Sequence, residues 1–206
     1  MPVTILDHPL AVHLLAELRG RDTQPGAFRK LTYQLTTLLV LEATKAIPTK
    51  TRMVQTPLEE CEQRVLGQGL AVVPILRAGL AMLEPIAQMF PDVAVGYIGL
   101  ERDHATAVAN SYYCKLPDLQ DRFTLCVDPM LATGGSASQA LNLIKAKSPA
   151  GLVMISVVSA PEGLKRLFSD HPDVHVVTAG VDRGLDARKY IVPGLGDYGD
   201  RLYGTS

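Results

Sequence analysis

The stretch RFTLCVDPMLATGGSASQAL, residues 122–141, decides the fold. It begins with an apolar run that ends at Asp128, passes through Gly134 and Gly135, and continues with residues typical of a helix to about Lys147. A buried strand that leads through a glycine turn into a helix is the repeating unit of a parallel sheet. This stretch therefore predicts an α/β protein.

The same unit recurs on both sides of this stretch. The predicted strands are LAVVPI (70–75), VAVGYIG (93–99), LVMISVVS (152–159) and VHVVTAG (174–180). An Ala-, Leu- and Met-rich stretch to Met89 follows the first of them, and a helical pattern over 161–168 follows the third. We therefore expect a mostly parallel sheet flanked by helices on both faces, with ligands bound at the carboxyl ends of its strands.

The segments outside this alternation predict additions to the sheet. Leucines every four residues over 10–18, and an apolar face over 27–48, predict two N-terminal helices. The β-prone segment NSYYCKLP (110–117) predicts a hairpin arm or flap, and the tail from Val181 is too rich in glycine for a regular element. We expect one domain over 1–206, with a core at about 68–180 and a C-terminal segment at about 181–206.

Composition excludes several classes of protein. The chain has 206 residues and a net charge of -1, which gives no overall field to attract nucleic acid or an anionic membrane. Three cysteines without a CxxC pair favour a reduced, cytoplasmic protein, and no apolar run is long enough to span a membrane. The five histidines form no HExxH or similar pair, so we expect no metal site made by the protein.

The segment Thr133-Gly134-Gly135-Ser136 carries the strongest chemical signal. Two glycines at a helix start allow backbone N–H groups to converge, and with two hydroxyls they can surround a phosphate dianion. The alternative is an ordinary strand-to-helix turn in which Ser136 caps the helix. A Walker-type ATPase is disfavoured because the loop has no lysine, and the G-x-G-x-x-G pattern of dinucleotide folds is absent.

An acid that closes a strand, followed by a TGG turn that opens a helix, resembles the phosphoribosyl pyrophosphate (PRPP) loop of type I phosphoribosyltransferases. The form DPMLATGGS resembles that of the uracil-specific members of this family. Further strings resemble the same group in order along nearly the whole chain. They are HPL (8–10), VPILRAGLAM (73–82), IGLERD (98–103), YYCKLP (112–117), SAPEGL (159–164) and YIVPGLGDYGDR (190–201). The resemblance implies transfer of a phosphoribosyl group from PRPP to N1 of uracil, giving UMP and pyrophosphate.

The resemblance also implies roles for particular residues. Asp128, Arg77 and Asp197 are the expected catalytic residues. Uracil is expected to bind at Ile191, Gly196, Asp197 and Tyr198, mainly through the backbone. The residues expected to bind PRPP are Arg77, Arg102, Asp128, Pro129, Met130, Leu131, Ala132, Thr133, Gly134, Gly135, Ser136 and Asp197.

Two departures from the family pattern are visible. Pro129 stands where many type I members have a second acid, which leaves one carboxylate and leaves Mg²⁺ to be carried mainly by the pyrophosphate. The segment VDRGLDARKY (181–190) has Gly184, Asp186 and Lys189 in place of an Asn- and Gly-containing version.

The resemblance further implies a homodimer or larger homo-oligomer, and it leaves regulation by a nucleotide such as GTP open. Two other functions also stay open. One is a phosphoribosyltransferase for another base, such as a purine. The other is a PRPP-binding regulator of pyrimidine genes that binds RNA, which would need a basic face.

Overall fold

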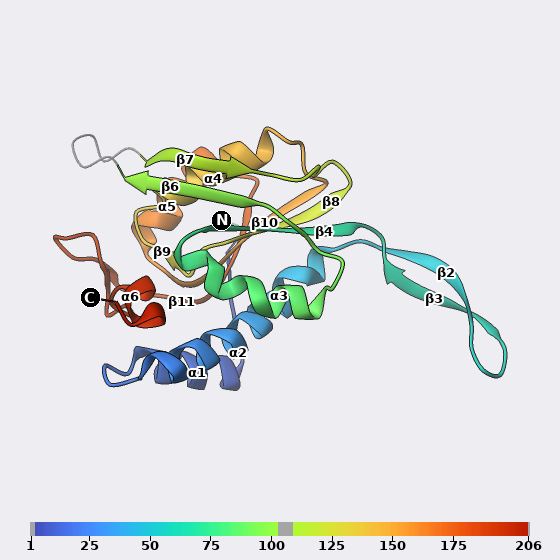
Figure 1. Ribbon diagram of the computed structural model, residues 1–206, viewed down its shortest axis with the longest axis horizontal. Coiled ribbons are helices and arrows are strands. Elements are labelled where there is room, and N and C mark those ends of the chain that lie inside the picture. The colour runs from blue at the N-terminus through green and yellow to red at the C-terminus, as the bar shows by residue number, and fades with distance from the viewer. Residues whose placement is uncertain (1–2, 103–108, 206) are drawn as a thin grey trace.

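A mostly parallel sheet forms the centre of the computed structural model, which describes residues 3–102 and 109–205 (Figure 1). The strand order is β1-β11-β10-β8-β4-β6-β7, with β5 beside β4 and β9 beside β10, and only β6 and β7 are antiparallel neighbours. The strands of this sheet are β1 (Val3–Ile5), β4 (Gly69–Leu76), β5 (Ala94–Val95), β6 (Tyr97–Arg102), β7 (Ala109–Lys115), β8 (Arg122–Val127), β9 (Met130–Leu131), β10 (Gly151–Ser159) and β11 (His175–Val181). The predicted α/β fold is confirmed.

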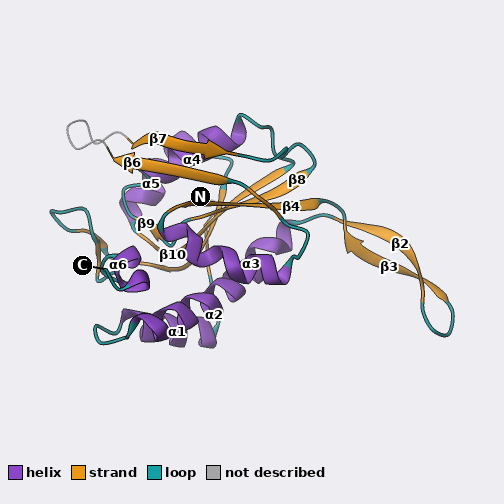
Figure 2. Cartoon of the chain, in the orientation of Figure 1, coloured by secondary structure: helices purple, strands orange, loops and turns teal. Residues whose placement is uncertain are grey.

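Helices cover both faces of the sheet (Figure 2). One face carries α1 (Pro9–Arg19), α2 (Pro25–Ala43), the 3₁₀ turns η1 (Thr44–Ala46) and η2 (Ala78–Met82), α3 (Leu83–Met89) and α6 (Tyr198–Tyr203). The other face carries α4 (Gly135–Lys145) and α5 (Pro161–Asp170). Among the described residues, no helix has the length and apolar character needed to cross a membrane.

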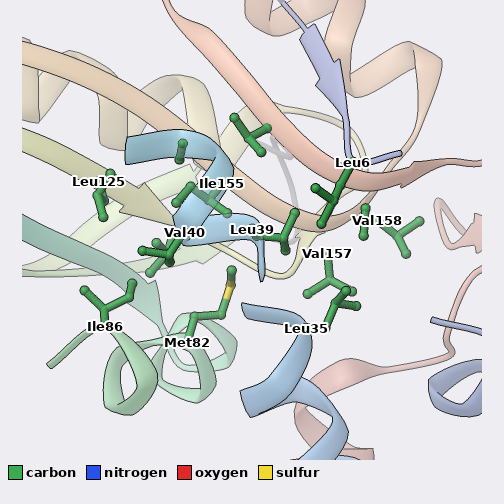
Figure 3. Packing of buried hydrophobic residues seen from close by; sticks show 14 of the residues in the cluster. Leu6, Leu35, Leu39, Val40, Met82, Ile86, Leu125, Ile155, Val157 and Val158 are labelled. Carbon is green, nitrogen blue, oxygen red and sulfur yellow. The ribbon is translucent and has the colours of Figure 1, made fainter. Parts of the chain in front are cut away.

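The central strands are apolar along their whole length because both of their faces are buried. In β4, Val72 packs against the layer that contains α1 and α2, whereas Val73 packs against the layer that contains α4 and α5. Cys126 in β8 is fully buried in the second layer, as expected of a structural cysteine. Figure 3 shows the first layer, where leucines of α2 meet Leu125 and Ile155 from the sheet.

The hairpin predicted between residues 100 and 120 is present as β6 and β7, which extend the sheet at its edge. Its turn, residues 103–108, lies outside the described residues. The pattern did not predict a second hairpin, formed by β2 (Thr49–Gln55) and β3 (Glu60–Leu66). These two strands pair only with each other and project from the body of the molecule (Figure 1).

The prediction that the tail from Val181 has no regular element is wrong. It forms a two-stranded ladder of β12 (Gly184–Leu185) and β13 (Ile191–Val192), followed by α6. Asp197 begins α6 because its side chain accepts a hydrogen bond from the N–H of Asp200 at 3.0 Å. Capping therefore offsets the low helix propensity of the glycines in this segment.

Candidate active site

The phosphate loop, residues 128–136, leaves the carboxyl end of β8 and opens α4. Gly134 is the N-cap residue of α4, and its φ of 76° lies in the left-handed region that favours glycine. The capping role considered for Ser136 is therefore wrong, because this residue already lies in the first turn. The first N–H groups of a helix have no acceptor within the helix, and the residues of this helix start line a small pocket, an arrangement in which an anion can bind.

That pocket has a volume of about 60 Å³ and adjoins a cavity of about 350 Å³. Both are lined by Asp128, Met130 and Ala132, so the two spaces meet along this part of the loop. The small pocket is lined further by Leu131, Thr133, Gly134, Gly135, Ser136 and Ala137. The cavity is lined further by Ala78, Arg188, Lys189, Tyr190, Ile191, Gly196, Asp197 and Tyr198.

The structure thus brings together most of the residues that the sequence predicted for the site, from segments about 60 positions apart. Pro129 lies outside both linings, and its carbonyl accepts hydrogen bonds from the N–H groups of Val157 and Val158 at 3.0 Å. Pro129 therefore fixes the loop to β10, whereas its neighbours in the loop face the ligand space.

Asp128 is the acid at the junction of the two spaces. Burial raises the pKa of its carboxyl to about 7, and a long contact of 3.5 Å from the N–H of Met130 opposes this shift only weakly. Burial, together with the charge of Asp128, also raises the pKa of the Cys126 thiol. The carboxyl group therefore gains or loses its proton near neutral pH, which makes it sensitive to any positive charge that develops beside it.

The tail presents its backbone to the cavity. Tyr198 turns its ring away, since its hydroxyl bonds to Thr32 at 2.7 Å and its ring meets Phe28 edge to face at 4.8 Å. Burial raises the pKa of this phenol. Ile191 is likewise buried, at 3 % exposure. Hydrogen-bond groups available to a ligand at these positions are therefore those of the main chain.

Long-range contacts from the N-terminal helices hold the tail in place. Arg19 makes a two-pronged ion pair with Asp182 at 2.6 and 2.9 Å and donates to the carbonyl of Gly194 at 2.9 Å. Asp182 in turn accepts from the N–H of Gly194 at 2.7 Å. Arg201 bonds to the carbonyls of Leu18 and Leu195. The helix α1 therefore positions the tail, which lines one side of the cavity.

The two arginines predicted to contact PRPP are placed differently. Arg77 is exposed at the start of η2, directly before Ala78, which lines the cavity. Arg102 is the last residue of β6, and its side chain lies outside the described part of the chain. The structure thus places Arg77 next to the cavity, and the role of Arg102 stays a prediction.

Sequence reasoning did not include Arg188 and Lys189, which line the cavity. They lie in a turn held by Asp186, whose carboxylate accepts from the N–H groups of Arg188 and Tyr190 at 2.9 Å. Lys189 has a φ of 69°, a conformation that L-residues other than Asn and Asp seldom adopt. In the sequence, the departure from the family pattern at Asp186 and Lys189 is the feature that could have indicated this turn.

The fold is structurally similar to that of type I phosphoribosyltransferases. A solved hypoxanthine phosphoribosyltransferase from Trypanosoma cruzi shares this fold, with a TM-score of 0.52 and 10% identity over 79% of this chain and 76% of that one. A much closer structure is that of the AQ2163 protein from Aquifex aeolicus, with a TM-score of 0.94 and 38% identity over 99% of both chains.

Sequence comparison gives the narrower assignment. A model of the family described as uracil phosphoribosyltransferase matches residues 5–205. A uracil phosphoribosyltransferase from Dictyoglomus thermophilum is 47% identical over 98% of this chain and 99% of its own length. The chain belongs to the uracil phosphoribosyltransferase family.

Proposed function

We propose that the protein transfers the 5-phosphoribosyl group of PRPP to N1 of uracil, giving UMP and pyrophosphate. The observation that carries this proposal is the junction of the pocket of about 60 Å³ in the phosphate loop with the cavity of about 350 Å³ along the tail. The small pocket can hold a phosphate group and the larger cavity can hold a base, and the two spaces meet at Asp128. This arrangement matches a nucleotide product that is formed from PRPP and a base.

The phosphate end suits the 5-phosphate of PRPP. Thr133, Gly134, Gly135 and Ser136 line the small pocket, and their backbone N–H groups and hydroxyls are donors that suit a phosphate. From there the ribose would extend past Asp128, where its hydroxyls can donate to the carboxylate. We propose that Arg77, which is beside the cavity, and Arg102 bind the pyrophosphate.

The base end suits uracil because the ring presents O2, N3–H and O4 in one plane. Main-chain groups at Ile191, Gly196 and Tyr198 can match that pattern of donors and acceptors. Cytosine reverses the polarity at position 4 and lacks the N3 proton. Each mismatched buried hydrogen bond costs about 1 to 3 kcal/mol, so backbone recognition alone can exclude cytosine.

In the proposed step, the bond from C1 of the ribose to the pyrophosphate oxygen breaks, and its electron pair leaves with the pyrophosphate. The lone pair of uracil N1 forms the new bond, and the N1 proton passes to solvent; we propose that Asp197, which lines the cavity, assists this transfer. Positive charge builds on the ribose ring in between. Asp128 faces this charge in its ionised form, and stabilisation of that charge is the chief contribution of the protein.

Metal chemistry enters with the substrate. Among the described residues, no three His, Cys, Asp or Glu side chains lie together as a metal site. The carboxylates of Asp128 and Asp197 line the cavity and fit a Mg²⁺ ion held mainly by pyrophosphate oxygens and water. Such an ion would neutralise charge on the departing pyrophosphate.

Product formation with single bases tests the proposal and its alternatives. The protein is supplied with PRPP and Mg²⁺ and with uracil, cytosine, hypoxanthine, adenine or orotate in separate reactions. We expect UMP from uracil and no product from the other bases. A product from another base would overturn the assignment of the tail, whereas salt-sensitive RNA binding without any turnover would favour a regulator.

The hairpin of β2 and β3 supports the proposal that the protein is a homodimer or a larger homo-oligomer. A two-stranded hairpin is marginally stable in water by itself, and this one leaves Met53 and Leu58 exposed, at 53% and 94%. A second copy that covers this hairpin would bury these side chains. Sedimentation of a monomer at micromolar concentration would contradict the proposal.

We keep two further expectations as proposals. A cytoplasmic location is supported by three free cysteines, Cys61, Cys114 and Cys126, which suit a reducing compartment. Regulation by GTP is a second proposal, which the family resemblance leaves open. Initial rates measured with and without GTP at a PRPP concentration below KM would decide it.

A further inference from the structure

The helix α5 lies unusually close to the phosphate loop because two glycines meet where they touch. A methyl group added at Gly163 would lie 2.5 Å from the carbonyl oxygen of Ala132, and one added at Gly134 would lie 2.7 Å from the carbonyl oxygen of Gly163. No side chain fits between these segments. The first turn of α5 is therefore held directly against the loop.

One turn beyond Gly163, on the same face of α5, Arg166 extends along the start of α4. A methyl group added at Gly135 would lie 3.2 Å from Nη1 of Arg166 and 3.6 Å from its Cζ. Gly135 is the first residue of α4 and lines the small pocket. The guanidinium group is therefore next to the anion-binding end of this helix.

This place is unfavourable for an unneutralised cation. The N-terminus of a helix carries partial positive charge, which repels a guanidinium. Within the described residues, the carboxylate that pairs with Arg166 is that of Asp170, at a distance of 3.8 Å. The same Asp170 oxygen accepts a much shorter hydrogen bond, 2.6 Å, from the hydroxyl of Ser138. The ion pair of Arg166 is therefore long, because the oxygen it contacts is bonded more closely to Ser138.

The phosphate loop itself supplies no cation, because DPMLATGGS contains neither lysine nor arginine. A phosphate dianion in the small pocket would meet N–H groups, hydroxyls and the acidic Asp128. A nearby guanidinium would supply the missing positive charge and lose its own repulsion from the helix.

We propose that Arg166 is a further phosphate-binding residue, whose guanidinium donates to the 5-phosphate of PRPP and of UMP. This inference rests on the proposed function. The 5-phosphate is remote from the bond that breaks, so the contact is the same before and during the reaction. Arg166 therefore contributes to substrate affinity and leaves the chemical step unchanged.

The decisive experiment compares ligands with and without the phosphate on Arg166→Gln. Isothermal titration gives the Kd of UMP, uridine and ribose 5-phosphate at one ionic strength. Loss of one charge-assisted hydrogen bond weakens UMP and ribose 5-phosphate about tenfold and leaves uridine unchanged. In kinetics, KM for PRPP rises about tenfold, whereas kcat and KM for uracil stay within twofold.

Two further variants make the result specific. Lys165→Gln removes the neighbouring exposed charge on α5 and is expected to leave every constant within twofold. Arg166→Lys keeps the charge without the planar fork and is expected to give an intermediate Kd for UMP. Since Arg166 is 54% exposed, these variants are expected to fold, which circular dichroism checks.

The proposal is overturned if Arg166→Gln leaves the Kd of ribose 5-phosphate unchanged, or if it weakens UMP and uridine alike. Ribose 5-phosphate carries no base, so its titration tests Arg166 independently of which base the protein uses. A wild-type protein that binds ribose 5-phosphate but makes no UMP from uracil would contradict the proposed function and not this inference.

Discussion

The phosphate loop, residues 128–136, is held by its own strand–helix–strand unit, whereas the C-terminal tail, residues 181–203, is held by the N-terminal helices. The backbone partners of the loop lie in β10 and at its end, for example Ile155 for Asp128 and Ala160 for Leu131. The tail depends on contacts that span the chain, such as the ion pair between Arg19 and Asp182. One half of the cavity is therefore a local structure, and the other half is assembled only when the whole chain folds.

The difference is also chemical. The loop contains a buried carboxyl group without a cationic partner within ion-pair distance in the described part of the chain, and burial raises the pKa of Asp128 to about 7. In the tail, the buried carboxylate of Asp182 is paired with Arg19 and accepts a hydrogen bond from Gly194. Asp128 therefore lowers the stability of the fold but can interact with a ligand, whereas Asp182 stabilises the tail.

The largest effect is expected for Asp128→Asn, because it removes the charge that faces the ribose. The value of kcat/KM should fall by roughly two orders of magnitude, the usual loss for one group aimed at charge that develops in a reaction. Steady-state kinetics at pH 8 checks this, with Asp121→Asn on the exposed surface as a control that should keep its activity. Turnover by Asp128→Asn close to that of the wild type would refute the assigned role.

The same variant has a signature in stability. The pKa of Asp128 is about 7 in the folded protein and 3.8 as the ordinary value. Between about pH 4 and 7, the carboxyl group of Asp128 is therefore protonated in the folded state and ionised in the unfolded state. The free energy of unfolding of the wild type falls as the pH rises through this window. The difference in free energy of unfolding between Asp128→Asn and the wild type should therefore shift in favour of the variant by about 2 to 3 kcal/mol from pH 5 to pH 8. Thermal unfolding at the two pH values measures this gain.

The local character of the loop explains why its site could be predicted from sequence. A strand, an acid, two glycines and a helix follow one another within about twenty residues, so the pattern and the structure refer to the same short segment. The contact that brings Gly163 and Arg166 to this loop comes from the next helix, and no pattern within the loop indicates it.

The tail could be predicted only as a set of family motifs. Its glycines indicate an irregular segment, but α6 forms because Asp197 caps it and because Tyr198 and Leu202 are buried against the N-terminal layer. Asp182, the partner of Arg19, lies 163 positions away, and Leu18, one partner of Arg201, lies 183 positions away, beyond the range of any periodic pattern. The hairpin of β2 and β3 was missed for a related reason, since its mostly polar strands lack a buried face within the chain.

A smaller effect, and one confined to the tail, is expected for Arg19→Ala. The variant leaves Asp182 buried without its cation, which should lower the free energy of unfolding by about 2 to 3 kcal/mol. Because Gly194 loses a partner as well, KM for uracil should rise more than KM for PRPP. Urea unfolding and two-substrate kinetics measure these changes.

Lys45→Ala is the matched control for Arg19→Ala, since the pair of Lys45 and Glu42 is on the surface, with the lysine side chain 71% exposed. It should change stability by less than about 0.5 kcal/mol. If Arg19→Ala raised both KM values equally, the separation of the cavity into a loop half and a tail half would not hold.

The smallest effect is expected for Lys189→Gly, which tests strain within the tail. Lys189 has a φ of 69°, and a left-handed conformation costs an L-residue about 1 to 2 kcal/mol. The greater conformational freedom of glycine in the unfolded chain offsets part of the strain that the substitution relieves. The free energy of unfolding should therefore rise by about 0.5 to 1 kcal/mol. Ser148→Gly provides a control, because Ser148 has a φ of 49° and lies outside the cavity lining. Equal gains in the two variants would show that strain alone acts at Lys189, whereas a smaller gain at Lys189 would show that its side chain stabilises the turn that faces the cavity.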